Sequence, residues 1–160
     1  MNKGEIKKIA TLCILKNKNK FLLLKRYNEP NKNKFVPVGG KLKPHESPKD
    51  GVIRETFEET GIKIKDPKFF GILTESSPSS YNWISYIFSY EIKFIDPPIS
   101  DEGKLEWIKY ENLKSIPTPL TDHHIYKFIL ENRKFIINVL YDKELKLLEM
   151  VEEISNTKIK

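Results

Sequence analysis

Short runs of hydrophobic residues, separated by polar turns, predict a chain built mainly of β-strands. Runs rich in β-branched and aromatic residues and bounded by polar turn residues are typical of strands. By this pattern we expect strands at residues 6–15, 20–26, 35–38, 41–43, 69–74, 84–94, 105–110, 135–141 and 145–151. We expect a helix at 48–60, because residues typical of helix ends stand on both sides of it. We expect a second helix at 120–131, because its hydrophobic residues fall on one side. This mixture predicts an α/β or α+β sandwich.

The chain of 160 residues suits a single domain with its own hydrophobic core. We find no repeat and no domain-sized linker, so we expect one domain over 1–160, with a frayed tail after about residue 153. The N-terminus has no secretory-type segment, and the longest hydrophobic runs are far shorter than the ~20 residues of a spanning helix. With a lone cysteine, Cys13, these features predict a cytoplasmic protein that does not enter a membrane.

The charge balance of the chain is basic. Lysine and arginine total 28 against 22 acidic residues, which gives a net charge of +6. Only Arg26, Arg54 and Arg133 are arginines, so lysines supply nearly all of the positive charge. A basic domain suggests a polyanionic partner, and the charge alone leaves nucleic acid, a nucleotide and an anionic membrane surface open.

The ends of the first helix are well marked in the sequence. Ser47 can accept a hydrogen bond as the N-cap, and Pro48 suits the first helical position. Asp50 favours the positive end of the helix dipole, and Gly61 is well placed as the C-terminal stop.

Three carboxylates share one side of this predicted helix. At about 100° per residue, Glu55, Glu58 and Glu59 fall within an arc of about 100°, and we expect Ile53 and Phe57 to face a core on the other side. Like charges three or four residues apart repel each other, so the group needs a compensating cation. A hard divalent cation such as Mg²⁺ would supply it, and a merely solvated acidic face is the alternative.

The spacing around these carboxylates is specific. The chain has Gly40, five residues, Glu46, seven residues, and then Arg54-Glu55-Thr56-Phe57-Glu58-Glu59-Thr60-Gly61-Ile62. This resembles the Nudix box, Gly-x5-Glu-x7-Arg-Glu-U-x-Glu-Glu-x-Gly-U, where U is a bulky aliphatic residue. Seven identities stand at fixed spacing over 23 residues, and Thr56 at the first U position is the one departure.

The resemblance implies an α/β/α sandwich with a mixed sheet, and an enzyme that cleaves a nucleoside diphosphate linked to another group. It implies that Glu58 and Glu59 hold Mg²⁺ or Mn²⁺, and that Glu55 is a further ligand or the base that deprotonates water. Arg54 would hold a carboxylate in place through charge-assisted hydrogen bonds, either Glu46 or Glu55. The structural positions of the box are Gly40, Glu46 and Gly61.

Outside the box, the segments 35–42 and 101–107 and the terminal hairpin at 135–151 resemble the MutT-type branch, which hydrolyses 8-oxo-dGTP. By this likeness Glu102 is a further metal ligand or base, and Asp122 contacts the purine. The alternatives are a loop carboxylate for Glu102 and a helix N-cap for Asp122. Val36 stands where some members carry an asparagine that recognises the oxidised base, and its side chain forms no hydrogen bond. The resemblance predicts that the substrate-binding residues are Phe35, Gly39, Gly40, Lys41 and Asp122.

We therefore expect a Mg²⁺-dependent nucleoside triphosphate pyrophosphohydrolase, which releases a nucleoside monophosphate and pyrophosphate and could remove 8-oxo-dGTP. A Nudix hydrolase of ADP-ribose or dinucleoside polyphosphates is one alternative, and a non-hydrolytic nucleotide- or RNA-binding module is another. The expected partner is a nucleotide, drawn in by the lysines, and nucleic acid is not expected. The base preference and the oligomeric state stay open.

Overall fold

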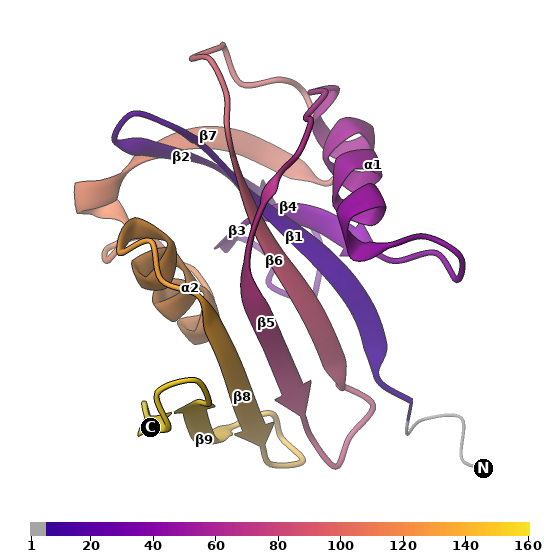
Figure 1. Cartoon of the computed structure of the whole chain (residues 1–160), viewed down its shortest axis with the longest axis vertical. Coiled ribbons are helices and arrows are strands. Elements are labelled where there is room, and N and C mark those ends of the chain that lie inside the picture. The colour runs from indigo at the N-terminus through magenta and orange to yellow at the C-terminus, as the bar shows by residue number, and fades with distance from the viewer. Residues whose placement is uncertain (1–5) are drawn as a thin grey trace.

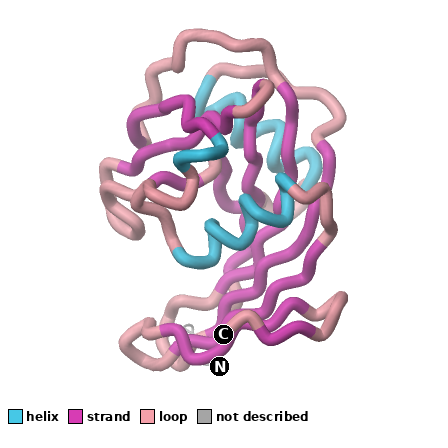
Figure 2. The backbone as a smooth tube through the Cα atoms, turned by 90° about the vertical axis from the view of Figure 1, so that its left-hand side faces the viewer, coloured by secondary structure: helices cyan, strands magenta, loops and turns pink. Residues whose placement is uncertain are grey.

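The computed structural model describes residues 6–160, and Met1–Glu5, where we expected no secretory segment, lie outside the described residues. A ten-stranded sheet occupies the centre of the described chain, and two helices cover opposite faces of its upper half (Figure 1, Figure 2). The predicted α/β/α sandwich is confirmed.

The helices are α1 (Pro48–Thr60) and α2 (Leu120–Leu130), and a short 3-10 helix, η1, spans Tyr110–Asn112. The strands are β1 (Lys8–Asn17), β2 (Lys20–Arg26), β3 (Phe35–Val36), β4 (Val38–Lys41), β5 (Lys68–Ser76), β6 (Trp83–Glu91), β7 (Gly103–Lys109), β8 (Phe135–Tyr141), β9 (Leu147–Glu152) and β10 (Thr157–Lys158).

The sheet is mixed, as the sequence predicted. Its strand order is β10-β9-β8-β5-β6-β1-β2-β3, with β4 paired to β1 and β7 paired to β2. The pairs β1–β6 and β5–β8 are parallel, and the other pairs are antiparallel. This order brings the end of β2 beside the start of β7, although more than seventy residues separate them in the chain.

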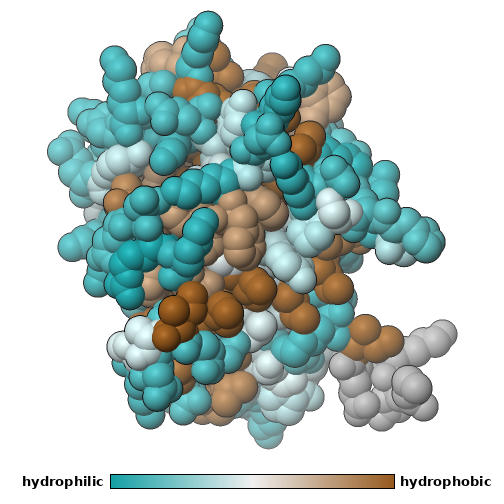
Figure 3. Space-filling model, viewed as in Figure 1, coloured by the Kyte–Doolittle hydropathy of each residue, from teal (hydrophilic) through white to brown (hydrophobic). Residues whose placement is uncertain are grey.

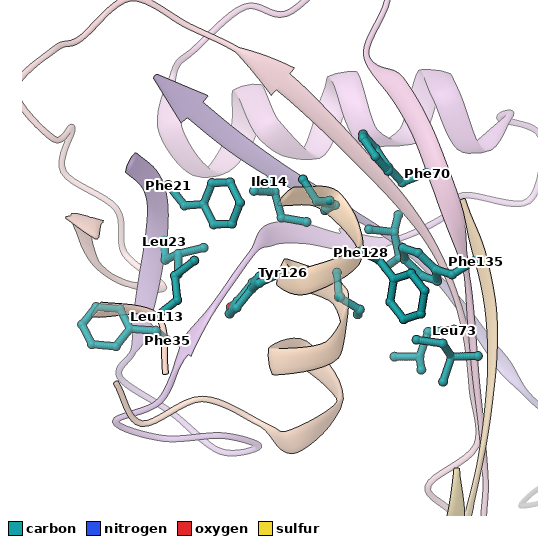
Figure 4. Packing of buried hydrophobic residues seen from close by; sticks show 14 of the residues in the cluster. Ile14, Phe21, Leu23, Phe35, Phe70, Leu73, Leu113, Tyr126, Phe128 and Phe135 are labelled. Carbon is teal, nitrogen blue, oxygen red and sulfur yellow. The ribbon is translucent and has the colours of Figure 1, made fainter. Parts of the chain in front are cut away.

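Each face of the sheet has its own hydrophobic core. On the α2 face, Tyr126 lies against Phe21, and Phe128 lies against Phe135 (Figure 4). On the α1 face, Val52 packs with buried strand residues, among them Cys13. Burial of each large hydrophobic side chain contributes about 1.5–3 kcal/mol, so the two cores hold both helices firmly on the sheet.

Helix α1 has the ends that the sequence predicted. The Ser47 hydroxyl accepts a hydrogen bond from the backbone N–H of Asp50 at 3.1 Å, and Pro48 is the first helical residue. Gly61 ends the helix with a left-handed φ of 71°, and its N–H donates to the carbonyl of Phe57. The direction of α1, and with it the direction of its side chains, is therefore set by local sequence.

The prediction that Phe57 faces a core is wrong, because its side chain is 48% exposed. The buried face of α1 is formed instead by small and β-branched residues, namely Gly51, Val52, Thr56 and Thr60. On the helix, Val52, Thr56 and Thr60 lie between Glu59 and Ile53, so Phe57 falls just outside this face. A lysine, Lys63, covers part of the exposed ring.

The segment at Gly39 and Gly40 also differs from the expectation. We expected these residues to link two extended segments, with a strand at 41–43, but both lie inside β4 and pair with Leu12 and Thr11 of β1. Pairing with β1 takes precedence because the N–H and C=O groups of buried backbone need partners. The two glycines therefore form a part of the sheet that carries no side chains beside α1.

The end of the chain is ordered rather than frayed. After Glu153 the chain turns and forms β10, which pairs with β9 in antiparallel register. The Glu152 carboxylate accepts hydrogen bonds from the backbone N–H groups of Ile154 and Ser155, and these bonds hold the turn. Backbone pairing explains the order of a segment with little hydrophobic content.

The surface in Figure 3 is hydrophilic over most of its area, with a band of hydrophobic residues across the lower half of the view. Such a surface fits a chain in which 31% of the residues are charged. Between residues 6 and 160, none of the helices has the length and hydrophobicity that a membrane span requires.

Candidate active site

Arg54 connects the carboxylates of α1 to the loop that precedes the helix. Its Nε and Nη2 atoms donate to the two oxygens of Glu46 at 2.9 and 2.5 Å. Its Nη1 atom donates to Glu55 at 2.7 Å and to Glu58 at 3.0 Å, and Nη2 also reaches the carbonyl of Lys41. The sequence left open whether Arg54 holds Glu46 or Glu55, and the structure shows that it holds both. A planar guanidinium suits this arrangement because its donors diverge at fixed angles.

Glu46 fixes the loop between β4 and α1. Its carboxylate also accepts the backbone N–H of Lys43 at 2.8 Å. The hydrogen bond from Arg54, with that of Lys43, lowers the pKa of Glu46 to about 2. Glu46 is therefore ionised at neutral pH and anchors Arg54 in place.

Glu59 is a partly buried carboxylate of the group. It lies beside the buried face of α1, and it accepts a hydrogen bond from the backbone N–H of Gly39 at 3.1 Å. Burial raises the pKa of Glu59 to about 7 against the effect of that hydrogen bond, and the charges of Glu55 and Glu102 raise it further. The site therefore concentrates negative charge that a cation would stabilise.

Gly40 gives the Glu55 carboxylate its place. A β-carbon at position 40 would overlap the side chain of Glu55, and one at position 39 would overlap the carbonyl of Thr11. The glycine pair of β4 therefore allows α1 to approach the sheet with its carboxylates against bare backbone.

A cleft of about 260 Å³ opens in front of these carboxylates. One wall is α1, and the other is the segment before β7; the lining residues are Glu55, Glu58, Glu59, Ile99, Ser100, Asp101 and Glu102. The carbonyl of Glu102 accepts the N–H of Tyr27, and the Ser100 hydroxyl accepts the N–H of Glu102. Residues from two distant segments thus bring four glutamates and an aspartate to one cleft.

The other predicted substrate-binding residues lie outside this cleft. Lys41 is exposed at the end of β4, directly after the glycine pair. Phe35 is buried in the core on the α2 face, where Lys25 covers its ring. Asp122 lies in the first turn of α2, and its side chain is buried rather than open to solvent.

Sequence reasoning missed Ile99, Ser100 and Asp101, which line the cleft beside Glu102. It also missed Glu75, a buried carboxylate in β5. Spacing along the chain gives no signal for Ile99, Ser100 and Asp101, because it is strand pairing in the sheet that brings their segment opposite α1. A glutamate in an otherwise hydrophobic strand pattern was the available signal for Glu75.

The donor set of the cleft fits a hard divalent cation. Carboxylate oxygens are the ligands that Mg²⁺ and Mn²⁺ prefer, and burial of Glu59, with the neighbouring charges of Glu55 and Glu102, raises its pKa. Among the described residues, no group of three or more acidic, histidine or cysteine side chains lies close enough together to hold a metal ion in the present side-chain positions. The guanidinium of Arg54 instead binds Glu55 and Glu58.

Comparison with known proteins places these features in a wider group. Residues 6–130 match the family model for the NUDIX domain. A Nudix hydrolase of Bacillus subtilis described as uncharacterized, YvcI, is 32% identical over 147 residues, which cover 87% of this chain and 90% of that protein. An ADP-ribose pyrophosphatase of Methanocaldococcus jannaschii is 30% identical and is aligned over 72% of this chain and 68% of its own. The crystal structure of a MutT protein from Bacillus halodurans superposes with a TM-score of 0.80 at 28% identity, covering 92% of this chain and 98% of that chain.

Proposed function

Because this chain belongs to the Nudix family, whose hydrolases generally use divalent metal ions, we propose that it is a Mg²⁺-dependent nucleoside triphosphate pyrophosphohydrolase. It would release a nucleoside monophosphate and pyrophosphate. The observation that carries this proposal is the meeting of Glu55, Glu58, Glu59 and Glu102 at one cleft beside the glycine pair of β4. The likeness to a MutT protein over nearly the whole chain supports it.

The four glutamates of the cleft would hold Mg²⁺, or Mn²⁺ in its place. When bound, the ion would neutralise the phosphates and stabilise the charge that develops as water attacks phosphorus. Arg54 contributes by holding Glu55 and Glu58 at fixed positions through charge-assisted hydrogen bonds. Glu55, which lines the cleft, would be a further ligand of the ion or the base that deprotonates water.

Glycines Gly39 and Gly40, with Lys41, form the proposed phosphate contact. The glycines expose backbone beside the cleft, and the ammonium group of Lys41 follows them on an exposed side chain. The excess of lysines over the whole chain would draw in an anionic nucleotide. Nucleic acid is not needed to explain the basic charge.

ADP-ribose is the second candidate substrate. The relative from Methanocaldococcus jannaschii that is 30% identical is named an ADP-ribose pyrophosphatase. The same carboxylate cleft would serve cleavage of its diphosphate, since both substrates contain a phosphoanhydride bond. The two proposals differ in what the rest of the pocket accepts and in the products released.

A substrate panel tests these proposals. The protein would be incubated with Mg²⁺ and, separately, dGTP, 8-oxo-dGTP, other nucleoside triphosphates, ADP-ribose and a diadenosine polyphosphate, and the products identified by chromatography. Pyrophosphate released from the triphosphates, with no turnover by Glu58→Gln, supports the main proposal. Turnover of ADP-ribose alone would support the second, and turnover of none of the substrates would refute both.

A further inference from the structure

The face of the sheet that carries α1 is uncovered in its lower half. Helix α1 packs on β4 and β1, and below it the strands β1, β6, β5, β8 and β9 lie side by side with no helix of the described chain over them on this face (Figure 1). Figure 3 shows a band of hydrophobic residues across the lower half of the molecule. An exposed hydrophobic patch that extends over several strands marks a site of interaction.

The strand register shows which side chains form this open face. A row of paired residues crosses all five strands, and the rows above and below it add further hydrophobic side chains. Alternation assigns these rows to the α1 face, because Cys13 of β1 and Phe88 of β6 lie in the core under α1. The hydrophobic residues of the open face are Ile9, Ile72, Ile84, Ile136, Leu140 and Val151, of which Ile9, Ile136 and Leu140 are 43%, 38% and 46% exposed.

The polar side chains between these hydrophobic residues have partners within the chain. The hydroxyl of Thr74 donates to Oδ1 of Asn138 at 2.5 Å, and Nδ2 of Asn138 donates to Oε1 of Glu153 at 2.6 Å. The hydroxyl of Ser76 accepts a hydrogen bond from Nζ of Lys7 at 2.6 Å. The middle of the open face can therefore lose its contact with water without leaving these polar groups unpaired.

Opposite charges stand at the two sides of the open face. Lys7, directly before β1, reaches across to β5, where its ammonium group donates to the hydroxyl of Ser76 and to the carbonyl of Glu75. The third N–H of this ammonium group is left over for another acceptor. On the other side Glu149 of β9 is 45% exposed and pairs with Leu140, which in turn pairs with Ser76. Lys7 and Glu149 therefore lie at the same height along the strands, on either side of β5.

From this arrangement we infer that the open face binds the same face of a second copy of this chain, in a two-fold symmetric dimer. A half-turn about an axis parallel to the strands and above β5, the middle strand of the five, places β1 of one copy over β9 of the other. Lys7 then meets the partner's Glu149, and the symmetry repeats this contact. A half-turn about an axis across the strands would instead place β9 over β9 and set its glutamates against each other.

The size of the open face fits a weak dimer. Five strands at a spacing of about 4.8 Å, with three side chains along each, give a footprint of roughly 500 Å² per copy. The two copies together would bury about 1,000 Å², which is at the low end for a specific interface between proteins. We therefore expect a dissociation constant in the micromolar range, with two sheets packed face to face.

Sedimentation of the full chain tests this dimer. Between about 1 and about 500 µM protein, we expect the mass to rise from 18.8 kDa toward twice that value. Leu140→Lys, at the exposed centre of the interface, should raise the dissociation constant at least about tenfold. Leu130→Lys is the matched control, because Leu130 is 44% exposed at the end of α2, outside the open face. Circular dichroism and hydrolytic activity would confirm that both variants are folded, since neither residue lines the cleft.

A charge exchange tests the orientation of the two copies. Glu149→Lys alone should weaken the dimer, because it sets two lysines against each other. Combining it with Lys7→Glu should restore the wild-type dissociation constant, and added salt should reduce both effects. A monomer at every concentration would overturn the inference, and so would a dimer that Leu140→Lys and Leu130→Lys affect equally. Failure of the double variant to recover would overturn the proposed axis. A monomer that instead sediments with vesicles of anionic lipid, and loses this binding in Leu140→Lys, would also overturn the dimer and assign the face to a membrane surface.

Discussion

Gly40 in β4 and Glu55 in α1 are in such close contact that a β-carbon on the glycine would overlap the carboxylate. The first glycine of the box is therefore required by the approach of the helix rather than by its own backbone angles. We expect Gly40→Ala to displace Glu55 and to lower kcat by about 100-fold, because a shift of about 1 Å at a reacting group costs this much. Steady-state kinetics in saturating Mg²⁺ would measure it, and a kcat within threefold of wild type would contradict this reading of the contact.

The last glycine of the box gives a matched comparison. Gly61 has a φ of 71°, and a β-carbon there would meet no other atom within 4 Å. We expect Gly61→Ala to lower the free energy of unfolding by roughly 1 kcal/mol through backbone strain, with kcat unchanged. Urea denaturation and kinetics on the same preparation would check both parts. A large loss of kcat in this variant would mean that the two glycines do not have separate roles.

The sequence was most informative where the determinants are local. Ser47, Pro48 and Gly61 set the ends of α1, and the spacing from Arg54 to Glu59 placed the carboxylates along one side of it. Which other side of α1 packs on the core was harder to predict. Small residues such as Thr56 form the buried face, so hydrophobicity alone assigned Phe57 to the wrong side.

The second wall of the cleft could not be predicted from spacing. Asp101 faces α1 only because β7 pairs with β2 and brings the preceding segment to the glutamates. Glu102 was named through the family likeness and not through any local pattern. The charge of Glu75 likewise acts on Asp122 only because β5 and α2, which are far apart in sequence, meet in space.

Glu58 offers the most direct test of the proposed metal site. Its side chain is 53% exposed and accepts a single hydrogen bond from Arg54 at 3.0 Å, so its replacement should not disturb the fold. We expect Glu58→Gln to retain less than about 1% of wild-type kcat with an unchanged melting temperature. Glu111→Gln, exposed in η1, is the control. Near wild-type rates for Glu58→Gln in saturating Mg²⁺ would remove Glu58 from the proposed site.

Thr56, the one departure from the box pattern, is expected to cost stability. Its side-chain oxygen is buried and has no hydrogen-bond partner of normal geometry among the described residues. Valine has the same shape without the hydroxyl, so Thr56→Val should raise the free energy of unfolding by roughly 1 kcal/mol. Chemical denaturation would measure the change. A destabilised variant would show that the hydroxyl is satisfied in solution.

Asp122 should make the stability of the folded protein depend on pH. Burial, with the charge of Glu75, raises its pKa to about 8 in the folded state, well above the ordinary aspartate value of 3.8. Between these two values the folded protein binds the proton more tightly than the unfolded chain does. Stability is therefore greatest near pH 4 as far as this group is concerned, and it falls as the pH rises toward 8, by at most about 1.4 kcal/mol per pH unit.

Asp122→Asn removes this titration. The amide cannot ionise, so the variant should gain stability relative to the wild-type protein as the pH is raised from 5 to 8, and the gap between the two should widen steadily. Urea denaturation of both proteins at several pH values in this range would measure the gap. Parallel stability curves would show that Asp122 ionises in the folded protein much as it does in the unfolded chain, and that its burial does not hold the proton.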